Sequence, residues 1–177
     1  MSYLDSTLVG EAYARLRPPH GDRVLVLGIG DAAMGDDGVG IHVVRQLQRE
    51  PRIPQVRLLA GGLSGAALLP DLDGTRAVIV VAGIADGRVA GMISYSQPQR
   101  VDDLPPGTGR AMEGVRELVA AAALLGRLPP AHLYTVSVAG APQERHRLSS
   151  PVAAAMAVVA CTVHGHALRL ATTGMTP

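Results

Sequence analysis

The sequence predicts a single α/β domain, a three-layer α/β/α sandwich around a mostly parallel sheet. Short apolar segments alternate along the chain with segments of helical periodicity, which is the pattern of strands joined by crossover helices. The chain has 177 residues, the usual size of one domain, and contains no internal repeat. We expect an N-terminal lead-in over residues 1–20, the α/β domain over 21–172 and a short tail over 173–177.

Five apolar runs are expected to form strands. The first, Arg23–Gly28, is apolar after its first residue and ends in glycine, as a central strand buried on both faces does. The run 91–96 is shorter and more polar, which favours an edge position. The expected strands are 23–28, 56–60, 77–81, 91–96 and 132–138.

Helices are expected between these strands. Apolar residues at 39, 43, 44 and 47 recur at helical spacing, and Pro51 follows them. Gly126 is a typical residue after the last turn of a helix, and Pro151 fits a first turn. The expected helices are 38–50, a short one ending near 71, 110–125 and 151–170.

Composition excludes several classes of function. The formal net charge is +1, and 2% of the residues are aromatic, so neither a basic surface nor stacking platforms for nucleic acid are expected. The sequence shows no apolar run of the roughly 20 residues that span a membrane. Cys161 has no partner for a disulfide and apolar neighbours, which predict a buried thiol. We therefore expect a cytoplasmic protein that binds neither nucleic acid nor membrane.

The loop after the first strand is the most informative segment. It contains Gly28, Gly30 and Asp31, and then Asp36 and Asp37 immediately before a helix. Either acid alone is explained by helix capping. A dinucleotide site is rejected, because carboxylates at the helix start would repel a pyrophosphate. Ligands of such sheets bind at the carboxyl ends of the strands, where the loops after Gly28, Ala60 and Val81 should meet.

Taken together, the motif Gly28-x-Gly30-Asp31, four residues, Asp36-Asp37-Gly38-x-Gly40 resembles the opening motif of the hydrogenase maturation proteases. Three further segments match that family in order: Gly61-Gly62-x-x-Gly65, the strand 78–81 followed by Gly91, and Leu148-Ser149-x-Pro151. The resemblance implies an endopeptidase that removes the C-terminal extension of a [NiFe] hydrogenase large-subunit precursor. It implies nickel carried by the substrate and no intrinsic cofactor.

The family holds the metal with three side chains: an acid in the first loop, an Asp after the third strand and a His at the start of a later helix. By the resemblance, Asp37 is the first of these, while the other two fall on Ala82 and Ala111, which cannot ligate. Asp31 stands at the family's Asn, and Ala60 at an Asp. We assign Asp37 and Asp31 as catalytic candidates and Asp37 as the metal-facing residue. The substrate loops are assigned to Gly28, Gly30, Asp36, Gly38, Gly61 and Gly62.

Other polar residues are assigned ordinary roles. Asp86-Gly87 is a common turn pair, and Glu113 and Glu117 suit a solvated helix face. Ser64 does not fit a nucleophile elbow. The histidines show no metal-ligand spacing and are expected at the surface, among them His42, His132, His146, His164 and His166.

Two functions of the family type remain open: an endopeptidase that relies on Asp31, Asp36 and Asp37, or a homologue without activity that binds in hydrogenase maturation. A third is a small-ligand α/β domain unconnected with hydrogenases.

Overall fold

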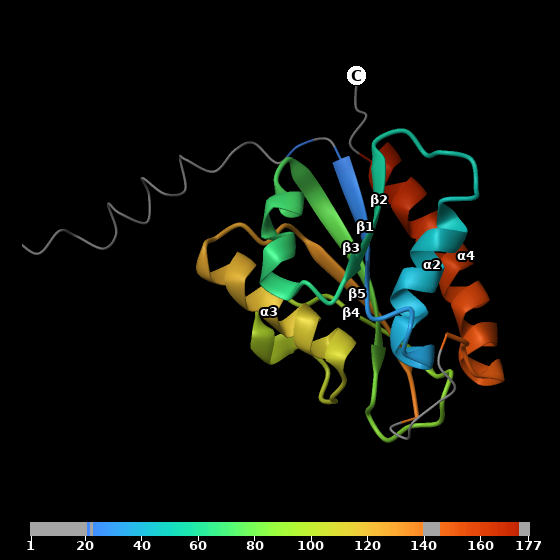
Figure 1. The fold of residues 1–177 in the computed structure, drawn as a ribbon. Helices are drawn as coiled ribbons and strands as arrows, with labels where there is room; N and C mark the ends of the chain where they lie inside the picture. The colour runs from blue at the N-terminus through green and yellow to red at the C-terminus, as the bar shows by residue number, and fades with distance from the viewer. Residues whose placement is uncertain (1–20, 22, 140–145, 174–177) are drawn as a thin grey trace, which may run out of the picture.

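A computed structural model describes residues 21, 23–139 and 146–173 of the chain. The expected lead-in over 1–20 lies outside the described residues, as does the tail from residue 174. The described part forms the three layers that the sequence predicts, with a central sheet between helices (Figure 1).

The sheet has five strands in the order β2-β1-β3-β5-β4. Four strands run parallel, and only β4, at one edge, is antiparallel to its neighbour β5. The edge position expected for the fourth strand is therefore confirmed. The strands are β1 (Arg23–Ile29), β2 (Val56–Gly62), β3 (Thr75–Ile84), β4 (Ile93–Ser96) and β5 (Ala131–Ser137).

Each face of the sheet is covered by its own layer. On one face pack α3 (Arg110–Leu124) and the 3-10 helix η2 (Gly65–Leu72), against alternate residues of the central strands such as Leu27 and Val80. On the other pack α2 (Val39–Leu47) and α4 (Ser150–Thr172), against Val26 and Val81. Because both faces are covered, β1 and β3 are almost entirely buried, as their continuous apolar sequence predicts.

The element bounds differ from expectation at strand ends and at turns: β3 runs Thr75–Ile84 rather than 77–81, and β4 begins at Ile93 rather than at residue 91. The first helix begins as the 3-10 helix η1 (Gly35–Gly38), inside the segment expected to be a loop, and α2 ends at Leu47 rather than at residue 50. A further 3-10 turn, η3 (Val101–Asp103), lies within another expected loop. These turns carry no apolar periodicity, so no pattern in the sequence marks them.

Two expectations about α4 were wrong. Cys161 is exposed, because α4 is apolar on nearly every side and its apolar neighbours do not mark the buried face; Val158 is exposed as well. The sequence analysis expected no segment long and apolar enough to span a membrane. By length and composition alone, however, α4 meets that condition. It packs on the sheet through Val152, Val159 and Val163, and 33% of its apolar window is buried.

Candidate functional site

The loops that leave the central strands meet at the carboxyl ends of β1, β2 and β3. The Gly30 N–H donates to the Gly62 carbonyl over 3.0 Å, which joins the first two loops. Residues Ala85 and Thr108 exchange two backbone hydrogen bonds and so bring the start of α3 to the end of β3. The expected meeting of the three loops is confirmed.

The backbone of the first loop requires glycine at position 30. Gly30 has a φ of 149°, and a Cβ built there would lie 2.1 Å from the Asp37 carbonyl oxygen. Close approaches also occur at Gly28, which faces the backbone of Gly40, and at Gly38, which faces that of Ala32. The glycines thus fold the loop tightly on itself, and this fixes where its three aspartates point.

Asp36 holds the fold together and does not line a crevice. Its side chain is 2% exposed. One carboxylate oxygen accepts from the Ser149 N–H at 2.6 Å, and the other from the Ser149 hydroxyl at 2.8 Å. Asp36 therefore fastens the first loop to the residue that precedes α4. Its assignment to a substrate loop stays a prediction, and the structure shows that both of its oxygens are occupied by this contact.

Asp37 is the carboxylate that faces the sheet end. Neither η1 nor α2 has a side-chain cap, so capping of its own helix does not explain Asp37. Instead Oδ1 accepts from the Ala111 N–H at 3.3 Å, in the first turn of α3. Oδ2 is buried and has no hydrogen-bond partner among the described residues. An orphaned, buried carboxylate oxygen is unusual and calls for an explanation.

Burial raises the pKa of Asp37 above its usual value, because a charged carboxylate loses solvation there. The backbone N–H groups of Ala111 and Asp31 act in the opposite direction, as does the Arg110 guanidinium, while the Asp31 charge raises the pKa further. The balance leaves a carboxylate that would gain from a cation beside its free oxygen.

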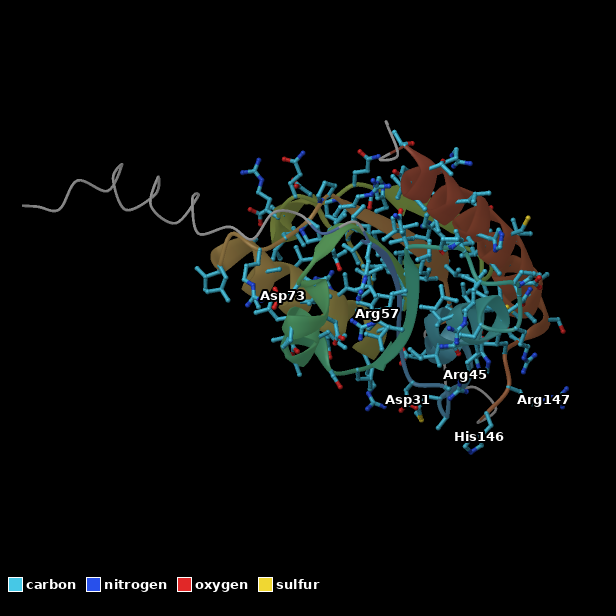
Figure 2. All side chains as sticks on the ribbon, turned by 90° about the horizontal axis from the view of Figure 1, so that it is seen from above. Asp31, Arg45, Arg57, Asp73, His146 and Arg147 are labelled. Atoms are coloured by element: carbon cyan, nitrogen blue, oxygen red, sulfur yellow. The ribbon has the colours of Figure 1, made fainter. Side chains whose placement is uncertain are left out.

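Asp31 lies at the rim of the same region and is paired. Its Oδ1 accepts from the Ala33 N–H, and its Oδ2 lies 3.3 Å from Arg110 Nη1. In Figure 2, Asp31 lies on the side of the molecule that also carries His146, whose N–H donates to the Ala33 carbonyl. Arg110 pairs with Asp31, and the charges of both residues affect the pKa of Asp37.

The other two ligand positions of the family resemblance are apolar in the structure. Ala82, near the end of β3, and Ala111, in the first turn of α3, are both fully buried. Ala111 nevertheless lies next to Asp37, as its backbone hydrogen bond shows. Among residues 21, 23–139 and 146–173 there is no group of three His, Cys, Asp or Glu side chains that could hold a metal ion.

The remaining acids have the ordinary roles expected of them. Asp86 occupies a turn whose Gly87 has a φ of 76°, and it accepts hydrogen bonds from Arg88 and Ser137. Burial tends to raise the pKa of Asp86, but these hydrogen bonds hold it below its usual value. Glu113 and Glu117 are exposed on α3. None of the three points to a replacement metal site.

The histidines are less exposed than expected. His42 is half-buried, with a buried Nε2 that has no partner within the described part of the chain. His132 and His166 join Tyr95 and Tyr134 in a four-ring cluster between β4, β5 and α4. The tyrosine hydroxyls share hydrogen bonds with His132 Nδ1 (2.8 Å) and His166 Nδ1 (2.9 Å). These three residues are partly exposed, and the sequence did not predict the contacts of His132 and His166, because these contacts come from elements distant in sequence.

Sequence reasoning missed two residues that shape the site. Ser149 was noted only within a motif, although it holds Asp36, and Arg110 was not singled out, although it pairs with Asp31. Arg110 adjoins the family position at Ala111, and this adjacency was the one available signal. A cleft of about 590 Å³ lies away from Asp37, at the end of the sheet where β1 and β2 begin.

Comparison with known proteins identifies relatives. No family model matches the chain. The hydrogenase expression/formation protein HupD of Rhodobacter capsulatus is 35% identical over 114 residues, which are 61% of this chain and 53% of that protein. The hydrogenase 2 maturation protease of Escherichia coli is 32% identical over 69 residues, 38% of this chain and 42% of that protein. The chain spans about half the length of the curated relatives it matches.

Solved structures show the same fold. The hydrogenase maturating endopeptidase HybD from Escherichia coli superposes with a TM-score of 0.69 at 23% identity, covering 81% of this chain and 91% of that one. The hydrogenase 2 maturation peptidase from a Thaumarchaeota archaeon gives 0.62 at 25% identity, covering 82% and 99%. The expected fold is therefore confirmed: the chain has the fold of these maturation endopeptidases, and part of its sequence is similar to hydrogenase expression/formation proteins and to a hydrogenase maturation protease.

Proposed function

We propose that this protein acts in [NiFe] hydrogenase maturation, as an endopeptidase that removes the C-terminal extension of the large-subunit precursor. The observation that supports this most is Asp37. Its carboxylate stands at the carboxyl ends of β1 and β3, at the family's first ligand position, with one oxygen bonded and the other buried without a partner.

The unpartnered oxygen of Asp37 would accept a metal ion that arrives with the substrate; because this atom is buried in the structure, the surrounding loops must open for the ion to reach it. A nickel ion in the precursor would supply the positive charge that Oδ2 lacks, and a carboxylate is an accepted ligand of such ions. The protein itself offers a single carboxylate there and needs no cofactor of its own in this proposal. The metal in the substrate would polarise the scissile carbonyl and assist attack by water.

The neighbouring residues have supporting roles in this proposal. Asp31 and Arg110 form an ion pair at the rim, where they can hydrogen bond to the backbone of an incoming peptide. The glycines at 30 and 62 keep the two loops close together, which leaves backbone groups accessible to the substrate. Asp36 only keeps the loop in place through Ser149.

A second function is favoured by a specific observation. Ala82 and Ala111 are both fully buried and apolar, so two of the three family ligands have no substitute at their own positions. A protein of this kind could bind the nickel-bearing end of the precursor through Asp37 without cleaving it. In this alternative the chain is an accessory protein of maturation. A small-ligand domain unconnected with hydrogenases is disfavoured by the relatives.

The proposed partner is thus the hydrogenase large-subunit precursor, and the proposed location is the cytoplasm. The net charge of +1 is nearly neutral, so nucleic acid is not among the proposed partners. The packing of α4 on the sheet supports a protein that does not insert into a membrane.

The test compares two precursors. The purified protein is incubated with nickel-loaded and with nickel-free large-subunit precursor, and the products are weighed by mass spectrometry. A truncated product from the nickel-loaded precursor alone is expected. A nickel-dependent complex that co-elutes without truncation would reject the endopeptidase and support the accessory function. Neither product nor complex would reject both.

A further inference from the structure

A cleft at the other end of the sheet is unrelated to the site described above. It has a volume of about 590 Å³, within the range of small-molecule sites. It is lined by residues of β1 and β2, of the connection between α2 and β2, and of the C-terminal half of α4. Asp31 and Asp37 follow the opposite ends of these strands and do not line it.

The cleft arises because β2 is an edge strand. The core layer beneath α2 and α4 is fully closed over β1 and β3 but only partly closed over β2. Three residues at this margin, Ile53, Val56 and Leu58, pack against that core layer and remain partly exposed, and all three line the cleft. Covering them would remove further apolar surface from water, so the floor favours a ligand with an apolar body.

Basic side chains border this floor. Arg52 and Arg23 line the cleft and are exposed, and neither forms an ion pair with a carboxylate of the described residues. Arg57 also lines the cleft, but its guanidinium is held by Asp71 at 2.5 Å. One acid, Glu50, opposes them. Among the described residues that line the cleft, the unpaired charge is therefore positive.

The backbone beside the cleft is held in an uncommon conformation. Gln55, a lining residue, has a φ of 63°, in the left-handed region that residues other than glycine seldom adopt. Its carbonyl accepts from the Val24 N–H at 2.8 Å, which fixes the turn against the start of β1. Strained residues of this kind gather at binding sites, where they keep a wall preorganised.

We propose that this cleft is a second binding site, for a small organic anion with an apolar body and a carboxylate or phosphate head. The body lies over Ile53, Val56 and Leu58, and the head meets Arg52. This inference does not rest on the proposed function, since it uses different residues and a different ligand.

The experiment titrates the full chain with four probes in a calorimeter: octanoate, octyl phosphate, octanol and inorganic phosphate. Binding of one or both octyl anions is expected, with octanol at least about tenfold weaker, since an arginine–anion hydrogen bond supports such a ratio. The two octyl anions distinguish a carboxylate from a phosphate head. Octanol that binds as tightly as the anions would overturn the proposal, and so would the absence of binding by any octyl probe. If inorganic phosphate alone binds tightly, the proposal that the ligand has an apolar body is refuted.

Two variants locate the site. Arg52→Ala should weaken octyl-anion binding about tenfold, whereas Arg49→Ala, an exposed arginine three residues earlier that does not line the cleft, should leave it unchanged. Because both side chains are exposed, neither change should affect folding. Equal affinity of Arg52→Ala and wild type would show that the head group binds elsewhere.

Discussion

The clearest test of the structure concerns the buried contact between Asp36 and Ser149. The substitution Asp36→Ala removes both carboxylate oxygens at once. It leaves the Ser149 N–H and hydroxyl without their partner at the point where α4 begins. If Asp36 is a structural residue, as its burial indicates, this change should lower the free energy of unfolding.

The magnitude follows from the two hydrogen bonds. A hydrogen bond to a charged group contributes about 1.5–3 kcal/mol, and two that share one carboxylate do not add fully. Ser149 is only half-buried, so water can reach part of what is left unpaired. We expect Asp36→Ala to destabilise the protein by about 3 kcal/mol. Ser149→Ala removes the hydroxyl contact alone and should cost about 1.5–2 kcal/mol, the lower part of that range.

Urea unfolding of the two single variants and the double variant measures these costs. The double variant should be less destabilised than the sum of the single variants, since both remove the same Oδ2–Oγ contact. Loss of less than about 0.5 kcal/mol in Asp36→Ala, the range of an ordinary surface change, would refute the assigned role.

Three further results are expected. Burial lowers the pKa of His132 and of His166 below 6.5, with the neighbouring His166 and Arg169 charges adding to the effect. As pH falls, the histidines of the unfolded chain therefore bind protons before those of the folded protein, and the free energy of unfolding should fall below about pH 6.5. The urea midpoint is measured from pH 7.5 to 5.5, about one unit on each side of the ordinary histidine pKa. A midpoint that stays constant over this range would contradict the expectation. Ala82→Asp with Ala111→His restores the family's ligand types, so Ni²⁺ should raise the melting temperature of this variant more than that of wild type, and an equal rise would count against the aligned positions. Gly30→Ala, whose Cβ would meet the Asp37 carbonyl oxygen, should destabilise the fold by about 1–3 kcal/mol in the same urea assay, and a neutral effect would contradict the tight loop.

The layers and the approximate positions of the strands were within reach of the sequence because they depend on local patterns. Apolar runs such as Arg23–Ile29 and the helical spacing of α2 mark elements directly, and right-handed crossovers limit how they can be arranged. The 3-10 turns η1 and η3 were missed because turns of this length carry no periodicity. Cys161 was misplaced because an apolar neighbourhood on a helix does not tell which side is covered.

The roles of the site residues stay predictions. Asp31 and Asp37 were singled out because a short motif contains both, and the charge of Asp31 contributes to the raised pKa of Asp37. The hydrogen bonds between Asp36 and Ser149 could not be predicted from the sequence, because the two residues are 113 positions apart. The same holds for the cluster around His132, in which Tyr95 is 37 residues away. Contacts of this separation depend on how the sheet and helices pack, which single residues do not reveal.

The central claim is that the free oxygen of Asp37 meets the nickel-bearing end of the precursor. The most direct measurement compares Asp37→Asn with Asp102→Asn, an exposed aspartate of η3, on nickel-loaded precursor, with truncated product and stable complex both quantified. The account predicts that Asp37→Asn loses both, while Asp102→Asn behaves as wild type. Undiminished product or complex with a correctly folded Asp37→Asn protein would contradict it.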